Sequence, residues 1–382
     1  MHKLIENQVR ISVRNLVEFI LRSGDLTSRS GTAADKEAML KGSRFHRKIQ
    51  KQMGSTYQAE VPLKKESEYE DLILCVEGRA DGIFAENETV CIDEIKGIYK
   101  SLDSLEEPVQ VHRAQALCYG WIYMEAHDLE RIDIQMTYGQ LDTEEIRRFR
   151  ETIAREKLEK WYQDLTDEYY KWVSYQLAWR KERNASMETL EFPFPYRKGQ
   201  REMVAGVYHA ISEEAQIFIQ APTGIGKTMS AIFPAVRAVG QGKGETVFYL
   251  TARTITRTVA EDAFSILRGK GLHFKSITIT AKEKMCFCDD MDCDPQKCPY
   301  AKGHYDRIND AVYELWTKEE AFDRETILAQ AEKYSVCPFE ITLDLAVWMD
   351  GIVCDYNYVF DPNVYLKRFF GENIKGKYLF LI

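Results

Sequence analysis

The sequence predicts an α/β protein with at least two domains. Its 382 residues exceed the length at which a single hydrophobic core is usual. Short apolar runs typical of strands alternate with stretches of helical periodicity, first up to about residue 141 and again from residue 189. Hydrophobic residues make up 45% and charged residues 29% of the chain, which excludes a largely disordered protein.

Residues 1–141 are predicted to form the first α/β domain. Apolar residues at helical spacing predict three helices, and short apolar or alternating runs predict three strands. The helices are expected at 12–26, 33–53 and 111–125, and the strands at 72–78, 89–97 and 132–139.

Residues 142–188 are dense in Glu, Arg, Lys and Tyr, and their helical periodicity predicts a helical connector. From 189 to 382, strands and helices alternate, which indicates a parallel sheet. A cysteine-rich insertion at about 280–340 interrupts this second domain. Its strands are expected at 215–220, 246–251, 351–356 and 377–382.

Targeting signals are absent from the sequence as given. No apolar run reaches the roughly 18 residues that span a bilayer, and the first ten residues lack the apolar core of a signal peptide. We therefore expect a cytoplasmic protein with no membrane partner. The net charge of −9 disfavours a uniformly DNA-binding surface, so a DNA partner requires a local basic groove. Oligomeric state is not predicted.

The segment APTGIGKT (221–228) has the pattern of a phosphate-binding loop, with Ala221 in place of the usual first glycine. Gly224 and Gly226 allow backbone amides to converge on phosphate oxygens. Lys227 would neutralise the β- and γ-phosphates, and Thr228 would hold Mg²⁺. The loop therefore predicts an ATP site; the alternative is a glycine-rich turn that binds nothing. Its residues are Ala221, Pro222, Thr223, Gly224, Ile225, Gly226, Lys227 and Thr228.

Five of the nine cysteines crowd into the insertion. Because the sequence has no export signal, metal ligation is favoured over a disulfide framework. Structural zinc usually uses closer pairs, so the open spacing and the two Cys-Pro steps favour a four-iron, four-sulfur (4Fe–4S) cluster over zinc or free buried thiols. Cys288 competes with Cys286 as the first ligand. The favoured set, spaced C-x6-C-x4-C-x38-C, is Cys286, Cys293, Cys298 and Cys337.

A second constellation lies in the first domain. Asp81 belongs to one predicted strand segment, and Glu94 and Lys96, two residues apart on another, share one face of it. Two carboxylates with a lysine suit metal-assisted phosphodiester hydrolysis, in which the acids hold Mg²⁺ or Mn²⁺ and the lysine orients water. A Glu-x-Lys pair alone is a weak signal. The full candidate set is His46, Asp81, Glu94, Lys96, Gln115 and Tyr119.

The phosphate loop, the cysteine insertion and VCDYNYVFDP (353–362) together resemble DEAD_2-type superfamily 2 helicases of the DinG and xeroderma pigmentosum group D family. The resemblance implies a RecA-like domain of an ATP-dependent 5′-to-3′ DNA helicase, in which the iron–sulfur domain helps form the gap for single-stranded DNA. It also implies adenine recognition by Tyr196, Arg197 and Gln200. In TARTITR (251–257), backbone contacts to DNA are implied for Thr251, Arg253 and Thr254, with helix capping as the alternative.

In the same family, an acidic DEAH box follows the strand that KYLFLI (377–382) matches. The resemblance therefore leads us to expect an incomplete motor and a chain that is a fragment. We expect no unwinding by these 382 residues alone, since the groups that activate the attacking water would lie further on. Residues 377–382 are expected to be exposed.

The order of the constellation in the first domain is similar to the RecB-like branch of PD-(D/E)XK nucleases. The resemblance implies a metal held by His46, Asp81 and Glu94, with Gln115 and Tyr119 touching DNA. It suggests a nuclease fused to a helicase in DNA repair or processing, acting on single-stranded or branched DNA. The alternative is a noncatalytic DNA-binding module with a degenerate nuclease fold and a structural metal cluster.

Overall fold

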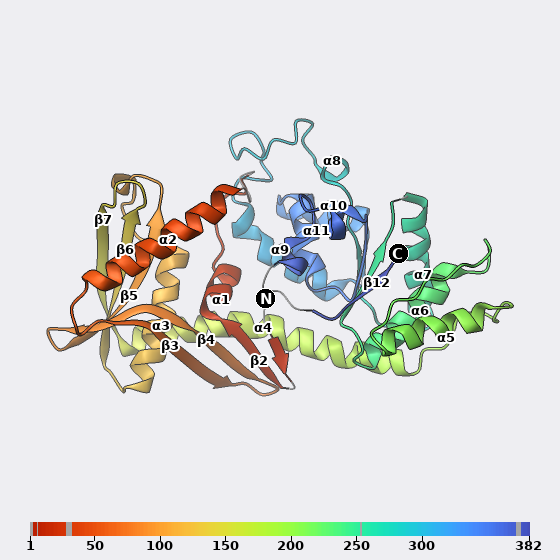
Figure 1. The fold of residues 1–382 in the computed structure, drawn as a ribbon, viewed down its shortest axis with the longest axis horizontal. Helices are drawn as coiled ribbons and strands as arrows, with labels where there is room; N and C mark the ends of the chain where they lie inside the picture. Colours follow the sequence, from red (N-terminus) through yellow and green to blue (C-terminus); the bar gives the residue numbers. More distant parts are fainter. Residues whose placement is uncertain (1–2, 6, 28–32, 253, 372–375) are drawn as a thin grey trace. The chain divides into compact units, whose positions relative to one another are not determined.

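The computed structural model describes the chain except for residues 1–2, 6, 28–32, 253 and 372–375 (Figure 1). The fold is mixed α/β. Two compact units are present: residues 1–23 with 29–174, and residues 24–28 with 175–382. Across the described part of the chain, no helix is both long and apolar enough to cross a bilayer.

The first unit is built on a mixed sheet of seven described strands, in the order β1-β2-β4-β5-β6-β7 with β3 paired to β4. The pairs β2–β4 and β5–β6 are parallel, and the others are antiparallel. The strands are β1 (Lys3–Ile5), β2 (Gln8–Ser12), β3 (Gln58–Glu68), β4 (Ile73–Glu86), β5 (Thr89–Ile98), β6 (Arg131–Gln140) and β7 (Ile146–Ala154).

Three helices and one 3-10 turn of this unit surround the sheet, and α4 contains the residue at which the two units divide. The helix expected at 12–26 is shorter, because Ser12 caps its start by accepting the Asn15 N–H and the helix ends at Ile20. The helices are α1 (Val13–Ile20), α2 (Ala33–Gln52), η1 (Leu102–Ser104), α3 (Gln110–Ala126) and α4 (Arg155–Glu188).

The prediction of helix from residue 142 is wrong at its beginning, because β7 occupies 146–154 and pairs antiparallel with β6. Exposed and half-buried residues alternate along β7, as they do on a strand with one covered face. Its many charged side chains conceal this period-two pattern, since a run of charges also suits a solvated helix face. The helical part begins at Arg155.

The second unit contains a five-stranded parallel sheet in the order β10-β9-β11-β8-β12. This confirms the predicted parallel sheet. The strands are β8 (Thr246–Leu250), β9 (Ser276–Thr278), β10 (Ala321–Phe322), β11 (Gly351–Cys354) and β12 (Tyr378–Leu381). The last strand pairs only with β8 among the described strands, and Phe380 on it is 43% exposed.

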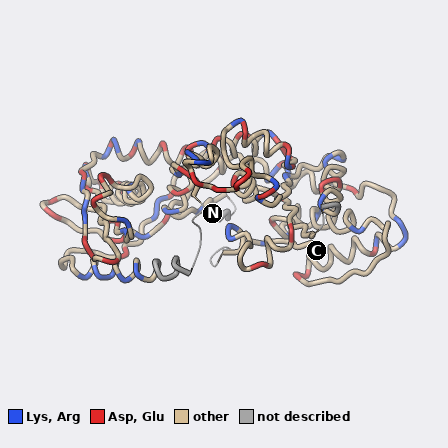
Figure 2. The backbone as a smooth tube through the Cα atoms, turned by 90° about the horizontal axis from the view of Figure 1, so that it is seen from above, with Lys and Arg blue, Asp and Glu red and all other residues tan. Residues whose placement is uncertain are grey.

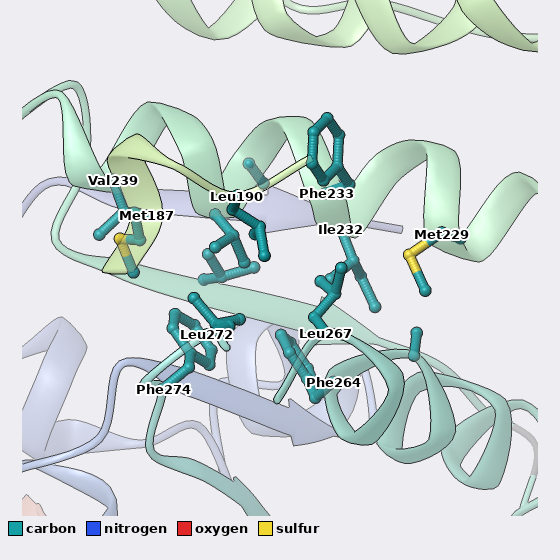
Figure 3. Close-up of a cluster of buried hydrophobic side chains, with 14 of the residues drawn as sticks. Met187, Leu190, Met229, Ile232, Phe233, Val239, Phe264, Leu267, Leu272 and Phe274 are labelled. Atoms are coloured by element: carbon teal, nitrogen blue, oxygen red, sulfur yellow. The ribbon is translucent and has the colours of Figure 1, made fainter. Parts of the chain in front are cut away.

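Helices α6 and α7 pack around β8 to form the main core of this unit, together with side chains from the end of α4 (Figure 3). Phe264 of α7 stacks on Phe274 with ring centroids 5.1 Å apart. The helices are α5 (Gln200–Ser212), α6 (Lys227–Gly240), α7 (Thr254–Arg268), α8 (Lys282–Met285), α9 (His304–Lys318), α10 (Arg324–Tyr334), α11 (Pro338–Ala346), α12 (Asn357–Phe360) and α13 (Lys367–Phe370).

The strand predicted at 215–220 is wrong: this segment has no regular secondary structure. Phe218 is 94% exposed and Ile217 is 46% exposed. A short apolar run resembles a buried strand, yet a strand needs a neighbour to satisfy its backbone N–H and C=O groups. Within the described sheet no strand pairs with this segment.

Candidate functional site

The phosphate loop turns directly into α6. Gly224 and Gly226 both have φ of +84°, in the left-handed region that glycine enters without the cost of a Cβ atom. Gly226 is the N-cap of α6, and Lys227 is its first residue. The free N–H groups of the first helical turn are therefore at the loop, as an anion-binding site requires.

The segment before α5 reaches the glycines of the loop. The Arg197 guanidinium donates to the carbonyl of Gly224. The Gln200 side chain lies so close to Gly226 that a Cβ there would be 2.7 Å from its amide nitrogen. Gln200 also accepts the Arg197 backbone N–H at 3.0 Å. Tyr196 instead stacks on Phe192, with ring centroids 4.4 Å apart, and is 44% exposed.

The chemically active side chains of the loop have internal partners. Lys227 Nζ donates to the carbonyl of Ala221 at 2.9 Å, and the Thr228 hydroxyl lies 3.4 Å from the Tyr249 hydroxyl of β8. The lysine thus lies across the loop. A phosphate oxygen would offer this ammonium a charged acceptor in place of a neutral carbonyl, which is the stronger interaction.

The cysteines of the insertion lie in one region. Cys298 and Cys337 pack with Leu26 and Ala301 in a buried cluster, and Cys288 packs against it. The sulfur atoms of Cys288 and Cys298 are 3.7 Å apart. Burial raises the pKa of the Cys288 and Cys337 thiols to about 11 each. Both thiols are therefore protonated at neutral pH in the absence of a cation, and metal binding would release their protons.

Two further contacts concern the predicted ligands. Lys282 Nζ donates to the Cys293 sulfur at 3.0 Å, and the Cys337 backbone N–H donates to His304 Nδ1 at 3.2 Å. Within the described part of the chain, no three or more His, Cys, Asp or Glu side chains are set to hold a metal ion. Cys286 is the C-cap of α8. Cysteine sulfur is the ligand type that soft metals prefer, and these thiols lie near one another. They do not, however, form a closed ligand set within the described structure.

The acidic constellation of the first unit is drawn together by four elements. Asp81 lies on β4, Glu94 and Lys96 lie on β5, His46 lies on α2, and the remaining two residues lie on α3. His46 Nδ1 is 3.5 Å from Asp81 Oδ1, and Asp81 Oδ2 accepts the backbone N–H of Ile95 at 2.8 Å. That backbone bond fixes the Asp81 carboxylate against β5 and turns one oxygen towards the histidine.

Glu94 and Lys96 meet Gln115 of α3 beside this pair. Lys96 Nζ donates to Glu94 Oε1 at 2.6 Å and to Gln115 Oε1 at 2.9 Å. Glu94 Oε2 is buried and has no hydrogen-bond partner among the described residues. Burial, reinforced by the charge of Asp81, raises the pKa of Glu94 to about 7. A buried oxygen without a partner is costly, and a divalent cation would satisfy it. Glu94 is thus suited to be a metal ligand, although His46, Asp81 and Glu94 do not form a closed ligand set in the described structure.

Tyr119, the remaining member of the set, is only 6% exposed. Its ring packs under β4, where a Cβ on Gly78 would lie 2.6 Å from the Tyr119 hydroxyl oxygen. Burial raises the pKa of this phenol above its ordinary value. In this structure Tyr119 supports the strand that carries Asp81.

His112 is half-buried near the acidic constellation. Its Nδ1 lies 3.2 Å from the Tyr138 hydroxyl, which itself accepts the Val109 N–H at 3.0 Å. Burial, with the charge of Lys96, lowers the pKa of His112 to about 4. The sequence signal that could have associated His112 with this constellation is its position three residues before Gln115, on the same face of α3.

The predicted DNA contacts after β8 have separate outcomes. Thr251 is only 4% exposed, and its N–H donates to the Cys354 carbonyl at 3.0 Å. Arg253 lies outside the described residues. Thr254 is the first residue of α7, and its side chain also lies outside the described part.

The second unit matches two helicase families. Residues 197–313 match the DEAD/DEAH box helicase family, and residues 273–374 match the DEAD_2 family. These matches show that residues 197–374 resemble helicases of the DEAD/DEAH and DEAD_2 families. They begin at residue 197 and so leave the acidic constellation unassigned. Comparison with curated proteins found no match.

Three solved structures resemble parts of the chain. One described as "XPD_Helicase" is 15% identical, covers 49% of this chain and 32% of its own, and has a TM-score of 0.32. One described as "Truncated XPD" is 17% identical, with 42% and 46% covered and a TM-score of 0.28. "Crystal structure of SSO0001" is 17% identical, with 43% and 78% covered and a TM-score of 0.28. The chain thus spans less than half of either XPD chain. Structural similarity at these TM-scores does not assign a functional site to this chain.

Proposed function

We propose that this chain carries part of an ATP-dependent 5′-to-3′ DNA helicase fused to a metal-dependent DNA nuclease, and that it acts on single-stranded or branched DNA in DNA repair or processing. The observation that most supports the motor is the contact of Arg197 and Gln200 with the glycines of the phosphate loop, inside the helicase-matched sequence. The domain division proposed is a nuclease at 1–141, a connector at 142–188 and the motor at 189–382.

ATP would bind with its triphosphate on the loop. The N–H groups that open α6 donate to phosphate oxygens, and Lys227 leaves the Ala221 carbonyl to pair with the β- and γ-phosphates. Thr228 holds Mg²⁺, which supplies charge neutralisation. Tyr196, Arg197 and Gln200 are proposed to contact the adenine, in keeping with the position of the last two beside the loop.

The nuclease centre would use His46, Asp81 and Glu94 to hold Mg²⁺ or Mn²⁺. The metal, when bound, supplies an activated water and stabilises the charge on the phosphate. Lys96 is held between Glu94 and Gln115, from where its ammonium orients the water or a phosphate oxygen. Gln115 and Tyr119, which are both buried, are proposed to position the DNA strand indirectly: Gln115 through Lys96, and Tyr119 through the strand that carries Asp81.

The cysteine region is proposed to bind a 4Fe–4S cluster through Cys286, Cys293, Cys298 and Cys337. The gathering of the thiols supports this, and the 3.7 Å contact with Cys298 makes Cys288 an equal candidate for the first position. Iron and sulfide analysis of anaerobically purified protein tests the assignment. About four irons per chain are expected; stoichiometric zinc without iron would contradict it.

The nuclease is tested by Mn²⁺-dependent cleavage of single-stranded DNA by the full chain. We expect cleavage that Asp81→Asn and Lys96→Ala abolish, while the exposed-site control Asp103→Asn retains it. No cleavage with any divalent metal would defeat the nuclease half. The noncatalytic DNA-binding module would then be favoured, in agreement with the lack of a closed metal-ligand set among the described residues.

A further inference from the structure

The helix that carries His46 is strongly basic in an otherwise acidic protein. Residues 38–59 contain five Lys and Arg residues and no Asp or Glu, whereas the whole chain has a net charge of −9. In Figure 2, the blue of Lys and Arg recurs along α2, the helix whose first residues join a grey segment. A local concentration of this kind creates a positive field even when the total charge is negative.

The basic residues of α2 share one face. The opposite face is apolar, with Phe45 6% and Ile49 0% exposed, and packs with Ile95 and Leu141 in one cluster. Positions that are three, four and seven residues apart lie on the same side of a helix. The exposed basic residues with this spacing, here called the α2 stripe, are Arg44, Arg47, Lys48 and Lys51.

The α2 stripe is poorly neutralised by the protein itself. Lys48 pairs with Glu144, and Arg47 donates to the Ser43 hydroxyl at 3.2 Å. Arg44, Arg47 and Lys51 have no ion pair within the described residues. Like charges three or four residues apart on a helix repel each other and destabilise it. An ordinary solvated helix face would include acidic residues at these spacings.

We propose that the α2 stripe binds the phosphate backbone of a single DNA strand and guides it to the acidic constellation. His46 lies within the same stretch of α2 and approaches Asp81 at 3.5 Å, so the stripe and the centre share one helix. From Arg44 to Lys51 the helix rises about 10 Å, which matches about three phosphates of a strand stacked as in duplex DNA, at roughly 3.4 Å each.

Other anionic partners fit less well. A membrane-binding helix must insert an apolar face, and that face of α2 is buried against the sheet by Phe45 and Ile49. An acidic protein would not explain the proximity of a centre whose residues suit phosphodiester chemistry. The inference about DNA rests in this respect on the proposed nuclease function.

The test is the salt dependence of binding between the full chain and a fluorescent single-stranded oligonucleotide, in EDTA and without nucleotide. The triple variant Arg44→Gln/Arg47→Gln/Lys51→Gln keeps side-chain length and helix propensity. Each lost phosphate contact lowers the slope of log K against log salt by about 0.7, so a decrease of about 2 is expected. Arg44→Gln alone should lower the slope by about 0.7.

The matched control is Arg131→Gln/Lys157→Gln/Lys160→Gln, which removes the same charge from exposed sites of the same unit. Its slope should equal that of the wild type. Equal slopes for the two triple variants would overturn the proposal, as would displacement of DNA by polyglutamate of equal charge as readily as by unlabelled DNA.

The nuclease function is separated from the DNA track by Asp81→Asn. This variant should lose cleavage and keep the wild-type slope. If the wild type does not cleave but the stripe variant still lowers the slope, the nuclease fails and the track stands. If cleavage occurs and the slope does not change, the track fails alone.

Discussion

Asp350 is predicted to be essential for the stability of the second unit. Its carboxylate is 4% exposed and accepts from the Arg183 guanidinium at 2.5 Å, from Trp179 Nε1 at 2.9 Å and from the Lys275 backbone N–H at 2.9 Å. Three donors thus meet at one side chain, and one of them is a buried cation whose other side-chain hydrogen bonds go to the neutral Asn184. The bonds join the end of α4 to the residue that precedes β11.

The cost of Asp350→Ala follows from what it leaves behind. An unpaired buried charge costs about 3–5 kcal/mol, and each unsatisfied neutral donor adds up to about 1–3 kcal/mol, less any compensation by water. We therefore expect Asp350→Ala to lower the free energy of unfolding by at least about 4 kcal/mol. With a urea m-value of about 2–3 kcal/mol per molar, the unfolding midpoint should fall by at least about 1.3–2 M.

Urea unfolding followed by circular dichroism measures this loss. The matched control is Glu213→Ala, which removes a carboxylate from an exposed site of the same unit and should change the free energy of unfolding by less than about 0.5 kcal/mol. A midpoint for Asp350→Ala close to that of the control would refute the reasoning, because it would mean that the three donors find other partners at no cost.

Two further predictions concern glycine geometry and pH. Gly226→Ala places a methyl group 2.7 Å from the Gln200 amide nitrogen, at a residue whose φ is +84°. We expect it to weaken nucleotide binding, measured with a fluorescent ATP analogue, by about tenfold or more. Gly242→Ala, at φ of +74° with nothing within 4 Å, should leave binding unchanged. Burial lowers the pKa of Lys275 from 10.5 to about 8, so folding favours its neutral form. Relative to Lys275→Met, the free energy of unfolding of the wild type should therefore rise by about 3 kcal/mol between pH 8 and pH 10.5. The same pH dependence in wild type and variant would contradict this.

The local parts of the fold could be predicted from the sequence. The strands at 72–78, 89–97 and 132–139 correspond to β4, β5 and β6, because buried strands reveal themselves by apolar runs. The strand at 146–154 was missed because charge concealed its alternation. The exposed segment 215–220 was mistaken for a strand, because a strand depends on a partner that local sequence does not specify.

In the candidate sites, too, local contacts could be predicted from the sequence, and contacts between distant segments could not. The contact of Lys96 with Glu94 was predictable, since residues two apart on a strand face one way. The half-buried position of His112 was not, because it depends on Tyr138, 26 residues further along the chain. The packing of Leu26 against Cys298 and Cys337 joins segments far apart in sequence, so spacing alone cannot reveal it.

The central claim is that residues 221–228 form an ATP site, and isothermal titration of the full chain with Mg²⁺–ATP tests it most directly. We predict binding of one nucleotide per chain that is lost in Lys227→Met, since this ammonium is the cation lying across the loop. The control Lys243→Met, beyond the end of α6, should bind as the wild type does. Equal binding by wild type and Lys227→Met, or no binding by the wild type, would contradict the account.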